Sequence, residues 1–333
     1  MARLKSTIFF IIATMSAIVL SSSKTVHNQL IKEVSLSVSA PSKNDGQTPV
    51  TPGKKPARVT IWVHGTKTSG GFSSFVHAAP LGLRHVNELS RLYRLKNFTK
   101  ALATADPDNF PLEHFYAFGW SGALNFEKRK DAARNLYQAI KKLMSEYEVQ
   151  YGCKPDITLI THSHGGNVAL NLAAVKDADT DFTLRAILLA CPVQHETKKL
   201  VHDILFSKIY SFYSTSDMLQ IIDPQGLYKT EDNDKRHVEF SERQFPACDN
   251  LYQAQLKING HGIAHIGFIL ERFTMLLPQI INQIDCWAAQ EPIAQAQERI
   301  LQITLPEKPS LLFALPMDSE MINNLFDALQ GKA

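Results

Sequence analysis

The sequence predicts an α/β protein built on a mostly parallel central sheet that helices flank, in a single domain. Short apolar, β-branched runs recur along the chain, as in strands that are buried on both faces. Stretches with apolar residues at helical spacing separate these runs, which is the pattern of repeated βαβ units. Several runs lead straight into polar or glycine-rich turns, where parallel sheets carry their sites.

The N-terminal region carries no pattern of a folded core. Arg3 and Lys5 precede an apolar run over residues 8–20 that small serines follow, as in a secretory signal peptide. We therefore expect residues 1–23 to be a signal peptide or, alternatively, an uncleaved membrane anchor, and the protein to be exported (secreted or periplasmic). Residues 24–57, rich in proline, glycine and polar side chains, are expected to form a flexible N-terminal segment.

The first strand of the sheet is expected at residues 59–63, directly before His64-Gly-Thr-Lys-Thr-Ser-Gly-Gly71. Glycines clustered after a buried strand mark a loop whose backbone approaches another group closely, although an ordinary strand-to-helix turn has the same composition. Residues 81–95 then show helical spacing and are expected to form a surface helix.

A strand and a long helix are expected next. The strand covers residues 113–118, and Asn125 caps the amphipathic helix, which Gly152 ends. Trp120 lies in the turn after this strand. It is expected to be either a core residue or the wall of a substrate pocket, because apolar pockets are commonly walled by aromatic side chains.

The strand at residues 157–160 is followed by the turn Thr161-His-Ser-His-Gly165 and then by a helical apolar pattern. A serine in such a strand-to-helix turn is lifted clear of the sheet, and the N–H groups that open the helix point at the group it attacks. Ser163 is therefore the candidate nucleophile. His162 and His164 flank it without a carboxylate or cysteine neighbour, so a metal site is not expected there.

Two further strands are expected at residues 184–190 and 209–213, and an acid follows the second of them. Asp217 lies just past this strand end, at the carboxyl edge where α/β sheets place their sites. Asp223 is the alternative acid, but it lies further beyond the strand. Asp217 is the favoured candidate for this reason.

The last strand of the predicted sheet covers residues 252–258, and a helix is expected over residues 268–286. Two histidines lie in the loop between them. His265 is favoured because it stands directly before the helix, whereas His261, between two glycines, can serve to shape the loop. Hydrogen-bond geometry decides between them.

Three features lie outside this pattern. Residues 291–333 are expected to be a C-terminal extension with a short amphipathic helix. The charge-rich residues 224–250 fit either a small cap or, more commonly, a solvated loop. The cysteines are far apart with no C-x-x-C spacing, so a metal site on them is not expected, and their disulfide pairing stays open. They are Cys153, Cys191, Cys248 and Cys286.

These motifs resemble those of the α/β-hydrolase superfamily, on its lipase/esterase side. The similarity covers about residues 59–286. It rests on His64-Gly65 after a strand, on the turn around the serine, and on the chain order Ser163, Asp217, His265.

The resemblance implies an α/β-hydrolase catalytic domain over residues 58–290. It implies a serine hydrolase that cleaves carboxylic esters through a Ser-His-Asp triad and an acyl-enzyme intermediate. Backbone N–H groups of Thr66 and His164 would stabilise the oxyanion. One departure is Thr161, because the superfamily's Gly-x-Ser-x-Gly motif begins with glycine, and a side chain there can crowd the turn.

The resemblance also implies the partners. The substrate would be a small-molecule or lipid ester, and no metal or organic cofactor is required. Independently of the resemblance, the N-terminal apolar segment would associate the protein with a membrane if it is an uncleaved anchor. A formal net charge of +3 gives no reason to expect a nucleic-acid partner. The same triad also serves thioesterases, amidases and acyltransferases, and a non-catalytic binding protein on this scaffold is a further alternative.

Overall fold

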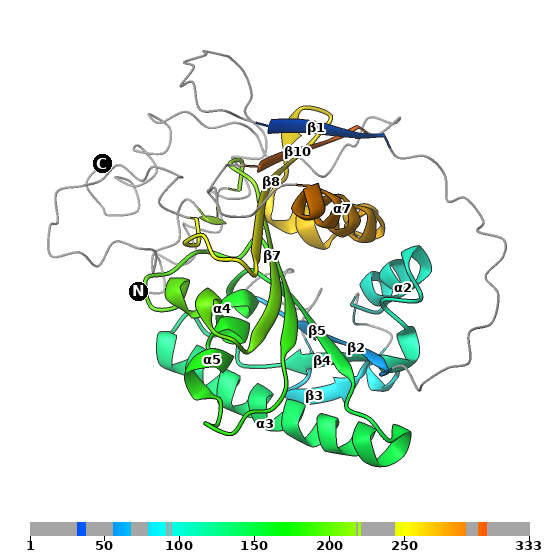
Figure 1. Ribbon diagram of the computed structural model, residues 1–333, viewed down its shortest axis with the longest axis vertical. Helices are drawn as coiled ribbons and strands as arrows, with labels where there is room; N and C mark the ends of the chain where they lie inside the picture. Colours follow the sequence, from blue (N-terminus) through cyan, green and yellow to red (C-terminus); the bar gives the residue numbers. More distant parts are fainter. Residues whose placement is uncertain are drawn as a thin grey trace, which may run out of the picture.

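The chain folds into one α/β domain with a sheet in the middle and helices on both faces (Figure 1). The computed structural model describes residues 32–37, 56–67, 79–90, 93, 95–217, 219–220, 244–290 and 299–304. The predicted α/β class and the mostly parallel, helix-flanked sheet are confirmed.

In the described residues the sheet has ten strands, eight of which are parallel neighbours in the order β1-β10-β8-β7-β6-β5-β2-β4. β3 pairs antiparallel with β4, and β9 pairs antiparallel with β8. The strands are β1 (Lys32–Ser37), β2 (Arg58–Val63), β3 (Gly82–His85), β4 (Phe115–Gly119), β5 (Asp156–His162), β6 (Leu184–Leu189), β7 (Phe206–Tyr213), β8 (Leu251–Ile258), β9 (His261–Gly262) and β10 (Arg299–Thr304).

The helices form two groups, one on each face of the sheet (Figure 1). α3, α4 and α5 pack together on one face, and α2 packs against α7 on the other. The α-helices are α2 (Leu95–Ala105), α3 (Phe126–Tyr151), α4 (His164–Leu170), α5 (Leu172–Val175) and α7 (Glu271–Gln290), and the 3₁₀ helices are η3 (Val86–Glu88), η4 (Leu112–His114), η5 (Lys198–His202) and η7 (His265–Ile269).

The long helix α3 begins and ends as predicted. The Asn125 side chain accepts a hydrogen bond from the backbone N–H of Lys128 at 3.0 Å, so it satisfies one donor of the first turn. Gly152 ends the helix with a left-handed φ of 78°, which glycine adopts without steric cost.

The chain leaves β2 and β5 in opposite directions, although these strands are neighbours. From β2 it continues through β3 and α2 to β4, on one side of β2. From β5 it continues through α4 and α5 to β6, on the other side. Diverging connections of this kind open a crevice at the carboxyl ends of the two strands, where open α/β sheets bind their ligands.

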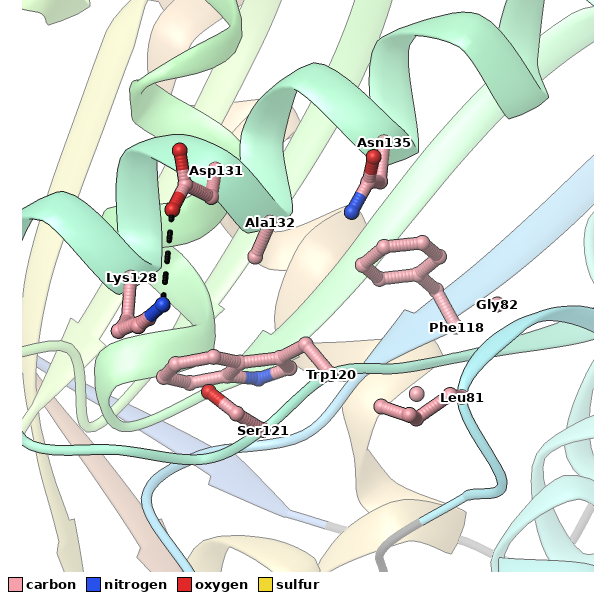
Figure 2. A pocket seen from close by; sticks show the side chains of 10 residues that line it. Leu81, Gly82, Phe118, Trp120, Ser121, Lys128, Asp131, Ala132 and Asn135 are labelled. Carbon is pink, nitrogen blue, oxygen red and sulfur yellow. Dashed lines mark ion pairs between the residues drawn. The ribbon is translucent and has the colours of Figure 1, made fainter.

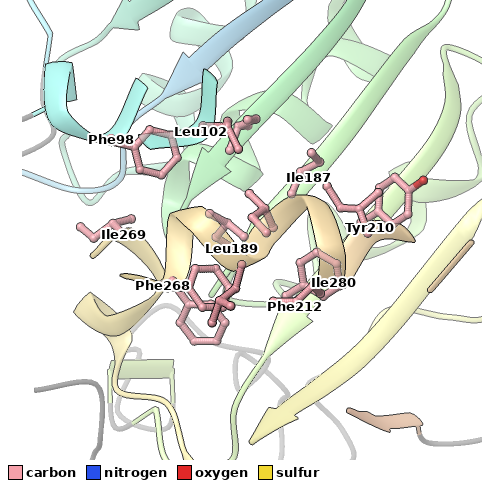
Figure 3. Close-up of a cluster of buried hydrophobic side chains, with 14 of the residues drawn as sticks. Phe98, Leu102, Ile187, Leu189, Tyr210, Phe212, Phe268, Ile269 and Ile280 are labelled. Carbon is pink, nitrogen blue, oxygen red and sulfur yellow. The ribbon is translucent and has the colours of Figure 1, made fainter. Parts of the chain in front are cut away.

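Side chains of each strand alternate between two hydrophobic clusters, one on each face. On β6, Ile187 and Leu189 belong to the cluster under α2 and α7, whereas Ala186 and Leu188 belong to the cluster under α3 and α4. Figure 3 shows the first cluster, in which side chains from α2, η7 and α7 meet the strands β6 and β7. Both faces are covered, so the strands read as continuous apolar runs in the sequence.

The prediction of a helix over residues 81–95 is wrong. Residues Gly82–His85 form the edge strand β3, and the helix α2 begins only at Leu95. Gly82 has a φ of 86°, outside the helical region, and Leu81 is 71% exposed, so it does not belong to a buried helical face. Hydrogen bonds to β4 satisfy this backbone instead, and tertiary pairing therefore overrides the local apolar spacing.

Two strands come from segments that we assigned to the flexible N-terminal segment and to the C-terminal extension. β1 pairs in parallel with β10, and β10 pairs in parallel with β8, so the sheet continues beyond the last predicted strand. The expected signal peptide, most of the charged segment 224–250 and the expected C-terminal helix lie outside the described residues. Within the residues that are described, none of the helices has the length and apolar character to cross a membrane.

We expect Phe273→Ala to lower the free energy of unfolding by about 3–5 kcal/mol, because it leaves a cavity between α7 and the sheet. Met275→Ala on the same helix is the matched control. Its side chain is 47% exposed, so the change should stay within about 0.5 kcal/mol. Urea unfolding of the two variants measures the difference. Equal destabilisation by both substitutions would contradict this assignment of the buried face.

Candidate active site

The candidate site lies at the carboxyl edge of the sheet, in the loops after β2, β5, β7 and β8. The loop after β8 contacts the loop after β7, since the Ile263 N–H donates to Ser214 Oγ at 2.8 Å. It also contacts the end of β5 through His162 and His265. The loop after β2 packs against the turn after β5 through Gly65. Four segments distant in the sequence therefore converge on one edge.

Ser163 lies in the sharp turn between β5 and α4. Its φ of 54° and ψ of −135° are rare for a residue with a side chain, and such strain persists only where the surroundings fix the backbone. One fixed point is the Ser163 N–H, which donates to Leu189 O at 2.9 Å. Ser163 is the N-cap of α4, so the N–H of His164 is among the helix donors that have no acceptor within the helix.

Two glycines let other backbone approach this turn. A Cβ on Gly165 would lie 2.3 Å from Val63 O, so only glycine allows α4 to start against the end of β2. A Cβ on Gly65 would lie 2.7 Å from Ser163 Cβ. Thr161, the departure from the superfamily motif, is buried with its hydroxyl donating to Ile187 O at 3.3 Å. Its side chain is therefore accommodated between β5 and β6.

Asp217 and His265 are in direct contact. Asp217 is fully buried, and its Oδ2 accepts a hydrogen bond from His265 Nδ1 at 2.7 Å. Its Oδ1 accepts from the N–H groups of Leu219 at 3.1 Å and Gln220 at 3.3 Å. A carboxylate held in this way fixes the ring orientation and the tautomer of its histidine. The alternative acid, Asp223, lies outside the described residues.

A hairpin after β8 brings His265 to this position. Asn259 and Gly260 have φ values of 49° and 81°, and β9 then pairs back onto β8. Positive φ at two successive residues is typical of a type I′ turn, for which Asn-Gly is the preferred sequence. Of the two candidate histidines, His265 is the one that contacts Asp217, while His261 lies exposed on β9.

His162 links the serine turn to the histidine loop. Its Nε2 lies 3.0 Å from the backbone oxygen of His265, which can only accept, so this nitrogen carries the proton. The two imidazole rings are tilted with their centroids 4.6 Å apart. The residue before Ser163 thus holds His265 directly beside the turn. In the part of the chain that is described, no three potential metal ligands group together.

His64 and Trp120 hold the loop after β2 in place. His64 Nε2 accepts a hydrogen bond from the Trp120 N–H at 3.1 Å, so the proton lies on Nδ1, which donates to Gly65 O at 2.7 Å. Trp120 Nε1 donates to His64 O at 2.7 Å. Because peptide units are planar, fixing the carbonyls of His64 and Gly65 also fixes the N–H groups of Gly65 and Thr66.

Trp120 also forms one wall of a cavity of about 410 Å³ (Figure 2). The cavity lies between the end of β4 and the start of α3, with Leu81 and Phe118 among its other walls. Lys128 and Asp131, 4.0 Å apart, lie at its side. The indole is 2% exposed and stacks on His64, with ring centroids 5.7 Å apart. Trp120 is thus a buried residue that also lines this cavity.

The residues that the sequence singled out occupy neighbouring positions. Asp217 and His265 are bonded, His265 lies against the residue that precedes Ser163, and Thr66 and His164 lie on the two loops beside the serine. No disulfide joins the four cysteines, all of which are in the described chain. Comparison of the chain with protein-family models and with curated proteins finds no match in either.

We expect His64 to remain neutral, with its proton on Nδ1, at every pH above about 4. Burial lowers the pKa of His64 from 6.5 to about 4. Below pH 6.5 the unfolded chain therefore binds a proton that the folded protein does not accept. Stability should fall as the pH drops from 6.5 to about 4, by about 3 kcal/mol from this group.

Two measurements check this expectation. Nitrogen NMR of the imidazole distinguishes a protonated Nδ1 from a bare Nε2 and follows their titration. Urea unfolding across the same pH range gives the loss of stability. A His64 ring that titrates near its ordinary pKa of 6.5 would contradict the proposed hydrogen bonds.

Proposed function

We propose that this protein is a serine hydrolase of the α/β-hydrolase type that cleaves carboxylic esters. The observation that carries the proposal is the Asp217–His265 hydrogen bond of 2.7 Å beside a strained serine at a strand-to-helix turn. Nucleophile, acid and histidine follow the strands β5, β7 and β8, in the chain order of the superfamily. The triads of chymotrypsin-like and subtilisin-like enzymes perform the same chemistry in other chain orders.

In the proposed reaction, His265 Nε2 takes the proton of Ser163 Oγ as the oxygen attacks the ester carbonyl. Asp217 holds the imidazole with Nδ1–H towards itself and stabilises the cation that forms. The imidazolium then gives its proton to the leaving alkoxide, which departs as the alcohol. Water, activated by the same histidine, hydrolyses the acyl-enzyme and restores the serine.

The oxyanion of each tetrahedral intermediate would lie between two backbone donors. One is the N–H of His164, at the start of α4, where the helix dipole also favours negative charge. The other is the N–H of Thr66, in the loop that His64 and Trp120 hold. Donors fixed before the reaction need no reorganisation in the transition state, which is why they lower its free energy.

We expect Ser163→Ala and His265→Ala each to lower kcat for a p-nitrophenyl acyl ester by at least about a thousandfold. A fluorophosphonate probe should label the wild-type protein at Ser163 and leave Ser163→Ala unlabelled. Parallel assays with the matched thioester and amide define the bond that is cleaved best.

His261→Ala is the matched control, because His261 lies in the same loop but is exposed on β9. It should keep activity within about threefold of the wild type, as surface substitutions usually change little. Loss of activity in His261→Ala with retention in His265→Ala would overturn the assignment of the histidine. A folded wild type that neither reacts with the probe nor hydrolyses any acyl chain length would overturn the proposed function.

We expect Trp120→Phe to lower kcat about tenfold while KM stays within about twofold, because it frees the His64–Gly65 peptide, which directly precedes the peptide of the proposed oxyanion donor Thr66. The substitution keeps an aromatic ring and removes only the Nε1–H donor to His64 O. Trp287→Phe, in the core on α7, is the control and should change neither constant. An equal loss in both variants would attribute the effect to packing and contradict the role of this hydrogen bond.

A further inference from the structure

Lys67 lies one residue beyond the proposed oxyanion donor and is held firmly in place. Its backbone N–H donates to Gly122 O at 2.8 Å, which ties the loop after β2 to the loop after β4. Its Cβ and Cγ pack against Gly122, since a Cβ on this glycine would come within 2.7 Å of both atoms. Gly122 has a φ of 67° and can therefore be only glycine without strain. The stem of Lys67 is thus fixed beside the site.

The side chain of Lys67 is partly buried, and among the residues that the structure describes it has no carboxylate partner. Other partly buried lysines of this protein have carboxylates, since Lys176 lies 2.8 Å from Asp203 and Lys208 lies 2.8 Å from Asp285. No carboxylate of the described chain forms such a pair with Lys67. Burial lowers the pKa of the Lys67 amine, as expected for a cation that loses water and gains no partner.

The groups next to Lys67 do not offset its positive charge. Burial is the main cause of the low pKa of His64, and the positive charge of Lys67 lowers that pKa further. The hydroxyl of Thr66 is buried and makes no hydrogen bond with the residues that are described. Among the described residues of the site, the carboxylate of Asp217 is already bonded to His265. Within the described residues, a cation without a carboxylate partner and a hydroxyl without a hydrogen bond therefore follow one another in the chain.

We propose that Lys67 binds a negatively charged group, a carboxylate or a phosphate, on the ester that Ser163 attacks. That the substrate is an ester rests on the proposed function. That it carries a negative charge rests on the environment of Lys67. An ammonium that is partly desolvated and has no carboxylate partner in the described part of the chain gains most from an anionic ligand, because that ligand replaces the lost water and supplies the opposite charge.

The anion can sit on either part of the ester, and matched substrates separate the two cases. On the acyl side, the p-nitrophenyl monoester of adipic acid is compared with p-nitrophenyl hexanoate. On the alcohol side, butyryl glycerol phosphate is compared with monobutyrin. The measured quantity is the ratio of kcat/KM for the anionic ester to that for its neutral partner, at low and at high salt.

We expect the wild type to prefer the anionic member of one pair, and the preference to weaken at high salt. Lys67→Met should lower the ratio about tenfold or more, the effect expected for losing a charged hydrogen bond. Lys67→Arg should retain most of the preference because it keeps the charge. The control is Lys142→Met on α3, which removes an exposed lysine paired with Glu146 and should leave the ratio unchanged.

A binding measurement keeps the proposal independent of catalysis. Adipate and glycerol phosphate are titrated into folded Ser163→Ala protein and into the same protein carrying Lys67→Met. Binding of one of them that Lys67→Met abolishes supports the anion site even if no ester is hydrolysed, in which case only the proposed function fails. The anion site is overturned if neither compound binds and the wild type shows no preference. It is also overturned if Lys67→Met slows neutral and anionic esters equally. In that case the charge of Lys67 would stabilise the oxyanion of every ester instead of binding an anionic group of the substrate.

Discussion

The close approach of backbone to backbone at the ends of β2 and β5 is the constraint on which the site depends. Gly165 lets the first turn of α4 lie against Val63 O, and Gly65 lets the next loop lie against Ser163. With either approach blocked, the serine turn would have to relax away from the loop, and its left-handed backbone would lose its support. The strained conformation and the two glycines are therefore parts of one arrangement.

Much of this arrangement could be predicted because short stretches of the sequence carry its pattern. The parallel strands are apolar on both faces, so β2, β4, β5, β6, β7 and β8 are visible as runs, and the polar turns after them mark the carboxyl edge. Ser163, Asp217 and His265 follow from those turns. His265 is favoured over His261 because it stands directly before the predicted helix, and its contact with Asp217, which the hairpin at Asn259 and Gly260 makes possible, agrees with this choice.

Other features depend on partners that are distant in the sequence. The role of Trp120 is set by the carbonyl of His64, 56 residues away, and no local pattern encodes that contact. Residues 81–95 have apolar spacing that fits a helix, but hydrogen bonding to β4 makes Gly82–His85 a strand. β1 shows alternation at Val34 and Leu36, too short a signal to outweigh the prolines and glycines that follow it.

The pairing of β1 with β10 has a consequence for the order in which the molecule is completed. The first pair in their register joins Lys32 to Arg299, a separation of 299 − 32 = 267 residues. During synthesis, the N-terminal strand emerges long before its neighbour exists, while the middle strands already have theirs. This end of the sheet is therefore closed last, and until then β8 presents an open edge that other chains can pair with.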